Sequence, residues 1–507
     1  MKKYFFWIIA LCLLQYCIPT QVLGKIHSPE IMNLEAKVKA AEKSKNWNNA
    51  AIYSSKLAEL YDSTEKYKKA AHFYRLSATF WEKAGHPDWG IVKVIRADHI
   101  DTEIKLLVEE PKERPAKLAK FEPMSGTYLG MFVAGKRENG RVNRVDEIYG
   151  KKHALYLTYT SWRKKYKDTN SYFPTSFAEE VKRNGGALQI GWEPSNGLDD
   201  VSDDAYVRQF AREANRAGIP IFLRYASEMN GEWVPWSRDP QKYVEKFRLI
   251  HDIMEEEAPN VAMVWSPNFL PRHNIDPYYP GDDVVDWIGF SLYTIPYSHG
   301  KEVLGGNPID YLRPLYEKYQ HKPIMISEGA VSHYSYQLQK DYSQWAAGQI
   351  GNMYGFLPKL FPNVKAITYF NLDKRTTNYD NQNNNYDLGD SQLVDDYYKR
   401  MIADEWFLSD IQKEIVEQNP SEYISLEEIK KPTTVRNCMV YVKLPLGQQP
   451  YYVAAYQGKR KLAESYSQPW EFNIDFSDVT LKQPITIIAF DKQFRRLAER
   501  DIIPLHK

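Results

Sequence analysis

Cysteine is scarce in this sequence, and its scarcity excludes several kinds of structure. The chain of 507 residues has 3 Cys, and two of them, Cys12 and Cys17, lie in or just after an N-terminal apolar run. A chain cleaved after Gly24 keeps only Cys438 and forms no internal disulfide. The 11 His form no HExxH motif and no cysteines are paired, so we expect no metal site and no cofactor.

Several other signals are absent as well. The formal net charge is +1, so the overall charge does not indicate nucleic acid or a membrane surface as a partner. The sequence has no GxSxG nucleophile elbow, no P-loop and no glycine-rich dinucleotide loop after its first predicted strand. Past the N-terminus, no segment stays apolar over the ~20 residues that a bilayer span needs.

Aromatic residues, in contrast, are abundant, with 37 Tyr and 13 Trp. Planar rings with a polar tip suit surfaces that bind flat, hydroxylated molecules. An aromatic-rich core gives the same composition, and composition alone favours that interpretation.

The N-terminus has the three parts of a secretory signal peptide. Lys2 and Lys3 precede the apolar run Tyr4–Leu14, and small or apolar residues precede Lys25. We therefore predict a signal peptide over residues 1–24 and a secreted, periplasmic or cell-surface protein with no membrane span after cleavage. An uncleaved anchor and a lipoprotein are the alternatives.

Residues 25–110 are predicted to be helical. Aromatic residues and alanine pairs alternate at helical spacing in two copies, twenty residues apart: Trp47, Ala50, Ala51, Tyr53 and then Tyr67, Ala70, Ala71, Phe73. The pattern is similar to a short module of tetratricopeptide type, which is a candidate for binding a protein partner. A helical cap without a binding role is the alternative, and a proline-containing linker follows over residues 111–124.

The segment from 125 to 410 alternates short apolar runs with amphipathic helices. Near-continuous apolar runs are typical of strands that are buried on both faces. Eight runs followed by helices predict an α/β fold, a (β/α)8 TIM barrel, with a doubly wound open sheet as the alternative. The runs begin at Tyr128, Ala154, Ala187, Ile219, Val261, Asp286, Pro323 and Lys365.

The C-terminal part changes to a period of two. After a linker predicted over 411–430, residues 431–507 alternate apolar and polar side chains, which predicts a small β-sandwich, immunoglobulin-like in type. Such a module either binds sugars or only spaces and stabilises, and we favour the second role. The Asn-rich run Asn378–Asn385 falls where a barrel places a functional loop.

Two glutamates lie just past predicted barrel strands, Glu228 after the fourth and Glu328 after the seventh. Side chains at these strand ends line the active site of a TIM barrel. Cleavage of a glycosidic bond needs one carboxyl group that holds a proton and another that stays ionised. Arg224 lies in the strand before Glu228 and is predicted to hold Glu328 ionised, which leaves Glu228, near Trp233 and Trp236, as the proton donor.

The barrel segment resembles glycoside hydrolase family 26, whose best-known members are β-mannanases. The matching stretches include GIPIFLRYASEMNGEWVPW, YYPGDDVVDWIGFSLY and KPIMISEGA, in the family's order. The resemblance implies that Glu228 is the acid/base and Glu328 the nucleophile. It also implies that Trp233 is a platform for the sugar, that Tyr293 contacts the nucleophile region, and that Tyr369 replaces an aromatic residue of strand eight.

Two positions depart from the family. Ser227 stands where the family has His, and Ser291 stands where it commonly has Asp. Both substitutions remove contacts to sugar hydroxyl groups, so a glucan or xylan is as compatible with the sequence as a mannan. Trp162, Trp192 and Glu193 are further candidates for subsite walls, with packing as the alternative for each.

The sequence therefore predicts a retaining endo-β-glycanase that acts on a polysaccharide or oligosaccharide by double displacement. The alternative is a catalytically inactive, glycan-binding barrel in a surface uptake complex. Ser227 and Ser291 favour the alternative, whereas both glutamates and Arg224 favour the enzyme.

Overall fold

The computed structural model describes residues 28–503 apart from 113–116, 165–168, 299, 377–383, 412–419, 430–431, 433 and 481. The predicted signal peptide and part of the predicted linker 411–430 lie outside the described residues. The chain divides into two compact units, Met1–Ala97 and Asp98–Lys507. In the described part of the chain, no helix has the length and apolarity needed to cross a bilayer.

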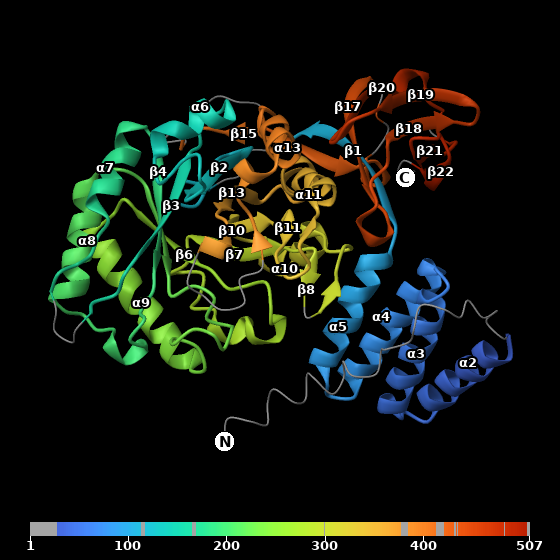
Figure 1. Ribbon diagram of the computed structural model, residues 1–507, viewed down its shortest axis with the longest axis horizontal. Coiled ribbons are helices and arrows are strands. Elements are labelled where there is room, and N and C mark those ends of the chain that lie inside the picture. Colours follow the sequence, from blue (N-terminus) through green and yellow to red (C-terminus); the bar gives the residue numbers. More distant parts are fainter. Residues whose placement is uncertain are drawn as a thin grey trace. The chain divides into compact units, whose positions relative to one another are not determined.

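The first unit is helical, as predicted (Figure 1). Its helices are α2 (Ser28–Lys43), α3 (Trp47–Asp62), α4 (Tyr67–Lys83) and α5 (Pro87–Ile100). The predicted alanine pairs of α3 and α4 are completely or almost completely buried, which lets the two helix backbones approach. The Ser77 hydroxyl group of α4 donates to the Ala51 carbonyl of α3 at 2.8 Å.

The second unit contains a closed barrel of eight parallel strands, which confirms the predicted TIM barrel (Figure 1). The last strand pairs with the first, with Ala366 opposite Tyr128, and this pairing closes the barrel. The strands are β2 (Thr127–Val133), β3 (Leu155–Thr160), β4 (Ala187–Trp192), β5 (Ile221–Tyr225), β6 (Val261–Trp265), β7 (Trp287–Thr294), β10 (Ile324–Val331) and β13 (Val364–Asn371). A short strand, β15 (Phe407–Leu408), pairs with the start of β2.

Helices cover the outside of the barrel, as the 3.6-residue period predicts. In α8 the predicted apolar face is buried at Val207, Phe210, Ala211 and Ala214. The Asp204 side chain caps the first turn of α8, and Gly218 ends it in the left-handed conformation. The helices are α6 (Val145–Tyr149), α7 (Thr175–Arg183), α8 (Ala205–Ala217), α9 (Pro240–Glu257), α10 (Pro308–Tyr319), α11 (Ser343–Ile350), α12 (Leu357–Leu360) and α13 (Gln392–Ile402).

The C-terminal region forms two four-stranded antiparallel sheets. One has the order β16 (Ser421–Ser425), β1 (Glu103–Pro111), β17 (Val435–Lys443) and β20 (Trp470–Asp475). The other has the order β19 (Arg460–Ser465), β18 (Tyr452–Gln457), β21 (Ile485–Phe490) and β22 (Arg496–Ile502). The predicted C-terminal β-structure is therefore present, and its immunoglobulin-like type stays a prediction.

Two of the predicted boundaries are wrong. Residues 103–110, expected to be helical, form β1, which lies between β16 and β17. Ile104, Leu106 and Val108 of β1 are buried on one face, a period of two that the apolar and buried Leu107 between them obscures. β16 lies inside the predicted linker 411–430, so the linker is shorter than expected.

Short strands lie in the loops that follow β7, β10 and β13. They are β8 (Tyr297–Ser298), β9 (Lys301–Glu302), β11 (Tyr334–Ser335), β12 (Lys340–Asp341) and β14 (Asn384–Asn385). β14 is the end of the predicted Asn-rich loop, and it pairs with β11. Most of that loop, residues 378–383, lies outside the described residues.

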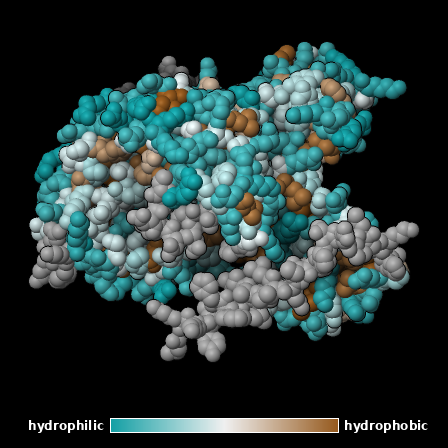
Figure 2. All heavy atoms as spheres, in the orientation of Figure 1, coloured by the Kyte–Doolittle hydropathy of each residue, from teal (hydrophilic) through white to brown (hydrophobic). Residues whose placement is uncertain are grey.

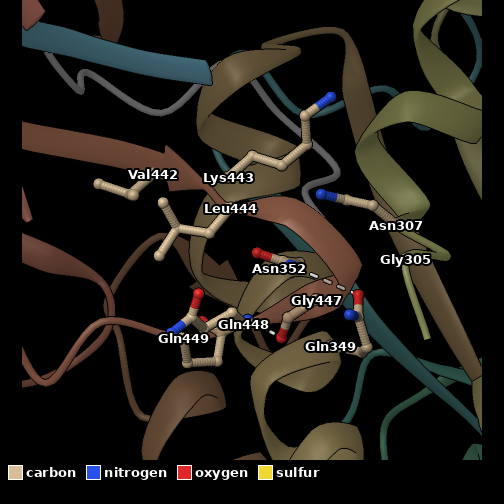
Figure 3. A pocket seen from close by; sticks show the side chains of 10 residues that line it. All are labelled: Gly305, Asn307, Gln349, Asn352, Val442, Lys443, Leu444, Gly447, Gln448 and Gln449. Carbon is tan, nitrogen blue, oxygen red and sulfur yellow. Dashed lines mark hydrogen bonds between the residues drawn. The ribbon is translucent and has the colours of Figure 1, made fainter. Parts of the chain in front are cut away.

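The face drawn in Figure 2 is mostly hydrophilic, with only small hydrophobic areas. Figure 3 shows a small cavity between the barrel and the end of β17, where amide side chains such as Gln349, Asn352 and Gln449 gather. None of the residues predicted for the active site lines this cavity.

Candidate active site

The turn after β5 places Glu228 at the carboxyl end of the barrel. Ala226 (φ 49°) and Glu228 (φ 59°) both adopt the left-handed backbone conformation. Each such residue costs about 1 kcal/mol or more, so surrounding contacts must hold the turn. The Glu228 N–H donates to the Ser266 carbonyl at 2.8 Å, and the Trp236 indole donates to the Ser227 carbonyl at 2.7 Å. These contacts fix the turn over the end of β6.

Both oxygens of the half-buried Glu228 carboxyl group accept a hydrogen bond. Oε2 accepts from the Trp233 indole at 2.9 Å, and Oε1 accepts from the Asn268 amide at 3.0 Å. Asn268 is held in turn, because its backbone N–H donates to the Asn230 side chain at 2.9 Å. The direction of the Glu228 carboxyl group is therefore fixed from two sides.

Glu328 lies on β10, where the register with β7 shifts between Ile326 and Glu328. Such an irregularity re-aims a side chain relative to the strand. The Glu328 carboxylate accepts a hydrogen bond from Arg224 Nη1 at 3.0 Å and further hydrogen bonds from the hydroxyl groups of Tyr159 and Tyr293. The ion pair that the sequence predicted between Arg224 and Glu328 is present.

These contacts set the charge of Glu328. Burial works to raise the pKa of Glu328, but the Arg224 guanidinium and the two tyrosine hydroxyl groups outweigh it, so the pKa lies below its usual value. Burial raises the pKa values of Tyr159 and Tyr293 well above 10, so both stay hydrogen-bond donors. Glu328 is therefore an ionised carboxylate at neutral pH.

The buried Arg224 is itself held on three sides. Its Nε donates to the Ser266 hydroxyl group and its Nη2 to the Ser291 hydroxyl group, each at 3.2 Å, beside the ion pair with Glu328. The charge of Arg224 also acts on Glu228. One guanidinium thus pairs with Glu328 and also interacts electrostatically with Glu228.

Strand register brings the two glutamates to one site. Glu328 of β10 is opposite Ser291 of β7, and Ser291 forms a bridge with Asn268. Asn268 donates to Glu228. Because adjacent strands lie ~4.8 Å apart, these steps place both carboxyl groups at the same end of the barrel.

A third carboxyl group, that of Glu193, lies among them. Glu193 follows β4 directly and interacts with Arg224, Glu328 and Glu228. Burial raises the pKa of Glu193 to about 7, against the attraction of Arg224, and the charges of the two other glutamates add to the rise. The site thus combines an ionised carboxylate with one that titrates near neutrality.

Comparison with known proteins finds a family model and several proteins that are similar to the barrel segment. The sequence model described as Glycosyl hydrolase family 26 matches residues 198–304, which include β5, β6 and β7. Endoglucanase H of Acetivibrio thermocellus is 27% identical over 273 residues, which are 50% of this chain and 28% of that protein. A β-1,3-xylanase of a Vibrio species, TXYA, is 30% identical over 130 residues, which are 25% of this chain and 26% of that protein.

The resemblance to glycoside hydrolase family 26 is confirmed. Among solved structures, a family 26 β-mannanase from Bacteroides ovatus matches with a TM-score of 0.41 and 14% identity, over 58% of this chain and 93% of that one. The curated matches cover less than a third of each relative's length. The family match and the curated relatives support a glycosidase.

The two departures from family 26 have a clear structural setting. Ser291 is completely buried and accepts a hydrogen bond from Arg224, so it serves the ion pair with Glu328. Ser227 is 3% exposed and interacts with Glu193. Both serines thus contact charged residues of the site.

Three predicted substrate contacts are wrong. Trp162, Trp192 and Tyr369 are 0–1% exposed, so none of them offers a face to a sugar. Trp192 stacks on Phe210 of α8 at 3.9 Å, outside the strand layer, and the Trp162 indole donates to Asp200 at 3.0 Å. These side chains belong to the core because they point away from the barrel mouth.

Of the other predicted residues, Trp233 is exposed (58%) and donates to Glu228, so its ring is available at the mouth. Tyr293 donates to Glu328. Trp236 is almost buried and holds the turn through Ser227, so its contacts are structural.

The sequence did not reveal the aromatic surroundings of Glu328. Tyr159 lies opposite Gly191 in the ladder of β3 and β4, and a side chain at Gly191 would collide with the Tyr159 ring. Phe132 and Phe370 stack at 4.8 Å beside Tyr159. A tyrosine facing a glycine is the one available signal, and it becomes visible only when the strand register is known.

Among the described residues, no three His, Cys, Asp or Glu side chains cluster in a way that could hold a metal ion. The charged groups of the mouth include the three glutamates and Arg224. Carboxyl groups in different protonation states can carry out acid, base and nucleophilic chemistry on a neutral sugar.

Proposed function

We propose that this chain is a retaining β-glycoside hydrolase that cleaves within a β-linked polysaccharide. One observation carries the proposal: Arg224 and two tyrosines keep Glu328 ionised at the same barrel mouth as Glu228, which forms no ion pair with any described residue. The retaining mechanism requires this division between a carboxylate that attacks and a carboxyl group that gives up a proton.

In the first step, the Glu328 carboxylate attacks the anomeric carbon while Glu228 gives its proton to the glycosidic oxygen. The bond from the anomeric carbon to that oxygen breaks, and a covalent glycosyl-enzyme ester forms at Glu328. In the second step, the ionised Glu228 takes a proton from water, and the water oxygen displaces Glu328 from the anomeric carbon. The net change is the addition of one water molecule.

The residues around the two glutamates fit these steps. The hydrogen bonds of Tyr159 and Tyr293 hold both oxygens of Glu328, so the attacking carboxylate has a fixed orientation. Trp233 is exposed beside Glu228 and offers a flat, apolar face to the sugar ring. Asn268 orients the other oxygen of Glu228, which does not accept from Trp233.

For the substrate, we propose a β-glucan or a xylan in preference to a mannan. The curated relatives carry the names endoglucanase and β-1,3-xylanase. Ser291, which replaces the Asp of the family, is buried under Arg224 and lies out of reach of a sugar hydroxyl group.

We also propose that the protein is exported. The proposal rests on the N-terminal segment, in which Lys2 and Lys3 precede the apolar run Tyr4–Leu14. Sequencing the N-terminus of the protein isolated from its native host should give a chain that begins at Lys25. A chain that begins at Met1 in the cytoplasmic fraction would contradict export.

The function is tested by incubating the purified protein with mannan, mixed β-glucan, β-1,3-xylan and β-1,4-xylan, and measuring new reducing ends. We expect activity on a glucan or a xylan. Glu328→Ala should abolish turnover and leave glycan binding intact, because the nucleophile is lost while the walls of the site stay in place. Glu232→Ala is the matched control, since Glu232 is an exposed glutamate of the same loop as Glu228.

A glycan-binding barrel without catalysis is the second candidate, which the serines at 227 and 291 favour. It predicts binding of a glycan without new reducing ends in the wild type. Normal turnover in Glu328→Ala would contradict the proposed mechanism.

A further inference from the structure

Glu193 follows β4 directly, on the face of the strand that points into the barrel. Side chains of a strand alternate between its two faces, so positions 189, 191 and 193 share one face. Gln189 lies inside the barrel, where it donates to the Ser327 carbonyl and accepts from the Thr368 hydroxyl group. At Gly191 the absence of a side chain makes room for the Tyr159 ring. Glu193 is the next member of this row, at the mouth.

Trp192 supports this direction from the opposite face. Its ring stacks on Phe210 of α8, at 3.9 Å and an interplanar angle of 6°, so the odd-numbered neighbours point the other way. The N–H of Ala226 donates to the Trp192 carbonyl at 3.0 Å, which joins the end of β4 to the turn that carries Glu228. Glu193 is thereby fixed beside the proposed catalytic groups.

Charged and titratable groups face Glu193 from three other strands. Arg224 and Glu228 come from β5 and its turn, Glu328 from β10, and Tyr159 from β3. The Ser227 hydroxyl group forms a hydrogen bond with Glu193. Glu193 therefore lies inside the proposed catalytic constellation but takes no part in the two chemical steps.

The buried cation of this constellation, Arg224, is already paired. Arg224 lies 3.0 Å from Glu328, and its remaining nitrogens bond Ser266 and Ser291. Burial disfavours a second ionised carboxylate beside Glu328, and the charges of Glu328 and Glu228 add repulsion, against the attraction of Arg224, so the neutral form of Glu193 is favoured. Consistent with this, burial raises the pKa of Glu193 to about 7. A neutral carboxyl group, unlike a carboxylate, can donate a hydrogen bond.

We propose that Glu193 binds a hydroxyl group of the sugar at the cleavage point and that it does so in its neutral form, as a hydrogen-bond donor. The inference rests on the proposed function and deepens it by adding a residue that selects substrates. In this chain Glu193 supplies the long polar contact that the short side chains of Ser227 and Ser291 cannot provide. It predicts a neutral sugar with a hydroxyl group at this position, and poor cleavage of the corresponding deoxy sugar.

The test compares the wild type with Glu193→Gln and Glu193→Ala on the best glycan of the panel, from pH 4.5 to 9. The amide of Gln donates without titrating, so Glu193→Gln should keep kcat/KM within about threefold of the wild type at pH 5.5 and move its fall at high pH upward. Glu193→Ala should lower kcat/KM by about tenfold or more, mainly through KM, because the contact is lost. Asp199→Asn, an exposed carboxyl group on the loop after β4, should change neither value.

Two results would overturn the inference. If Glu193→Gln showed the wild-type fall of kcat/KM at high pH, the titration of Glu193 would not govern binding. If Glu193→Ala kept the wild-type KM, Glu193 would not contact the sugar. The Gln variant is nearly isosteric and decides the question even where the Ala variant folds poorly.

The failure of the inference differs from the failure of the proposed function. A protein that cleaves a glycan while its Glu193 variants behave as the wild type contradicts only the inference. A protein that neither cleaves nor binds any glycan of the panel, measured by calorimetry, contradicts the proposed function and the inference together.

Discussion

At the scale of single residues, Arg224 decides how the two proposed catalytic carboxyl groups differ. It is completely buried, and its only carboxylate partner within 4 Å among the described residues is Glu328. An arginine keeps its charge in any environment that a protein offers. Arg224 lies on β5, the strand that leads into the Glu228 turn. From there it sets the charge of Glu328, which is distant from it in sequence.

Replacing Arg224 should change the pH dependence of activity. The pKa of Glu328 is lowered in the folded protein, so activity that needs the carboxylate is present above this pKa and is lost as the pH falls through it. In Arg224→Met the pKa of Glu328 should rise, because the attraction of the guanidinium is lost, and this moves the acid limb of kcat/KM to higher pH. The measurement is a pH–rate profile of the variant and the wild type.

A matched arginine distinguishes this effect from a general loss of stability. Arg212→Met removes a half-exposed arginine of α8 and should leave the acid limb in place. An unchanged acid limb in Arg224→Met, at a normal folded yield, would contradict the role given to Arg224.

Single residues also show where sequence reasoning reaches its limit. The partnership of Arg224 and Glu328 followed from charge and strand position alone. Trp192 and Glu193 were both given as candidates for the mouth, although only Glu193 faces it, because one step along a strand reverses the direction of the side chain. Tyr159 was missed because its contact with Glu328 depends on a register between β3 and β4 that the sequence does not display.

At the scale of elements, the sheet that contains β17 and β20 is joined to the barrel by ion pairs of two buried lysines. Lys443 of β17 pairs with Asp310 of α10 at 3.0 Å, and both side chains are at most 8% exposed. Lys359 of α12 pairs with Glu471 of β20 and with Asp404 after α13. Removing one member of a buried pair leaves an uncompensated charge, which is far more costly than removing both.

Lys443→Met should therefore destabilise the protein in a pH-dependent manner. Burial raises the pKa of Asp310 to about 6, so the stability that neutral Asp310 contributes is complete below its unfolded pKa and is lost as the pH rises through about 6. Without Lys443 the ionised Asp310 has no partner, so the loss should be about 3–5 kcal/mol at pH 8 and smaller at pH 4.5. Urea unfolding followed by tryptophan fluorescence at both pH values measures it.

The control is Lys461→Met, which removes one partner of an exposed pair with Glu464 and should cost less than about 1 kcal/mol. An equal loss for Lys443→Met at pH 8 and at pH 4.5 would show that Asp310 does not titrate as the account requires.

The elements themselves were predictable where both faces are buried. The eight apolar runs of the barrel are all strands, because a strand covered by helices outside and by packed side chains inside has little room for polar residues. β1 was assigned to a helix because the apolar Leu107 interrupts the alternation, and because its partner β17 lies more than 300 residues away in sequence. A strand whose partner is that distant leaves no local signal.

At the scale of the whole molecule, the proposed site belongs to one of two units. Glu193, Arg224, Glu228 and Glu328 all lie in the unit Asp98–Lys507, whereas the helical unit has a hydrophobic core of its own around Ala50, Phe80 and Trp81. Units with separate cores are expected to fold and function with some independence.

Deleting residues 28–86, which keeps α5, should therefore leave kcat/KM within about twofold of the full chain. A role of the helical unit in binding a protein partner is compatible with this result.

Deleting residues 435–503 should instead abolish soluble expression, because β1, Asp310 and Lys359 lose their partners. Steady-state kinetics and size-exclusion chromatography check the two deletions. Full activity without residues 435–503 would contradict the conclusion that the barrel and the C-terminal sheets form one unit.

The central claim is that Glu328 attacks the anomeric carbon directly and that Glu228 supplies and then recovers the proton. Proton NMR of an early hydrolysis reaction, recorded before the product mutarotates, tests this claim most directly. The account predicts that the new reducing end of a β-linked oligosaccharide appears first as the β-anomer, because two displacements restore the configuration. First appearance of the α-anomer would show a single displacement by water and would contradict the role given to Glu328.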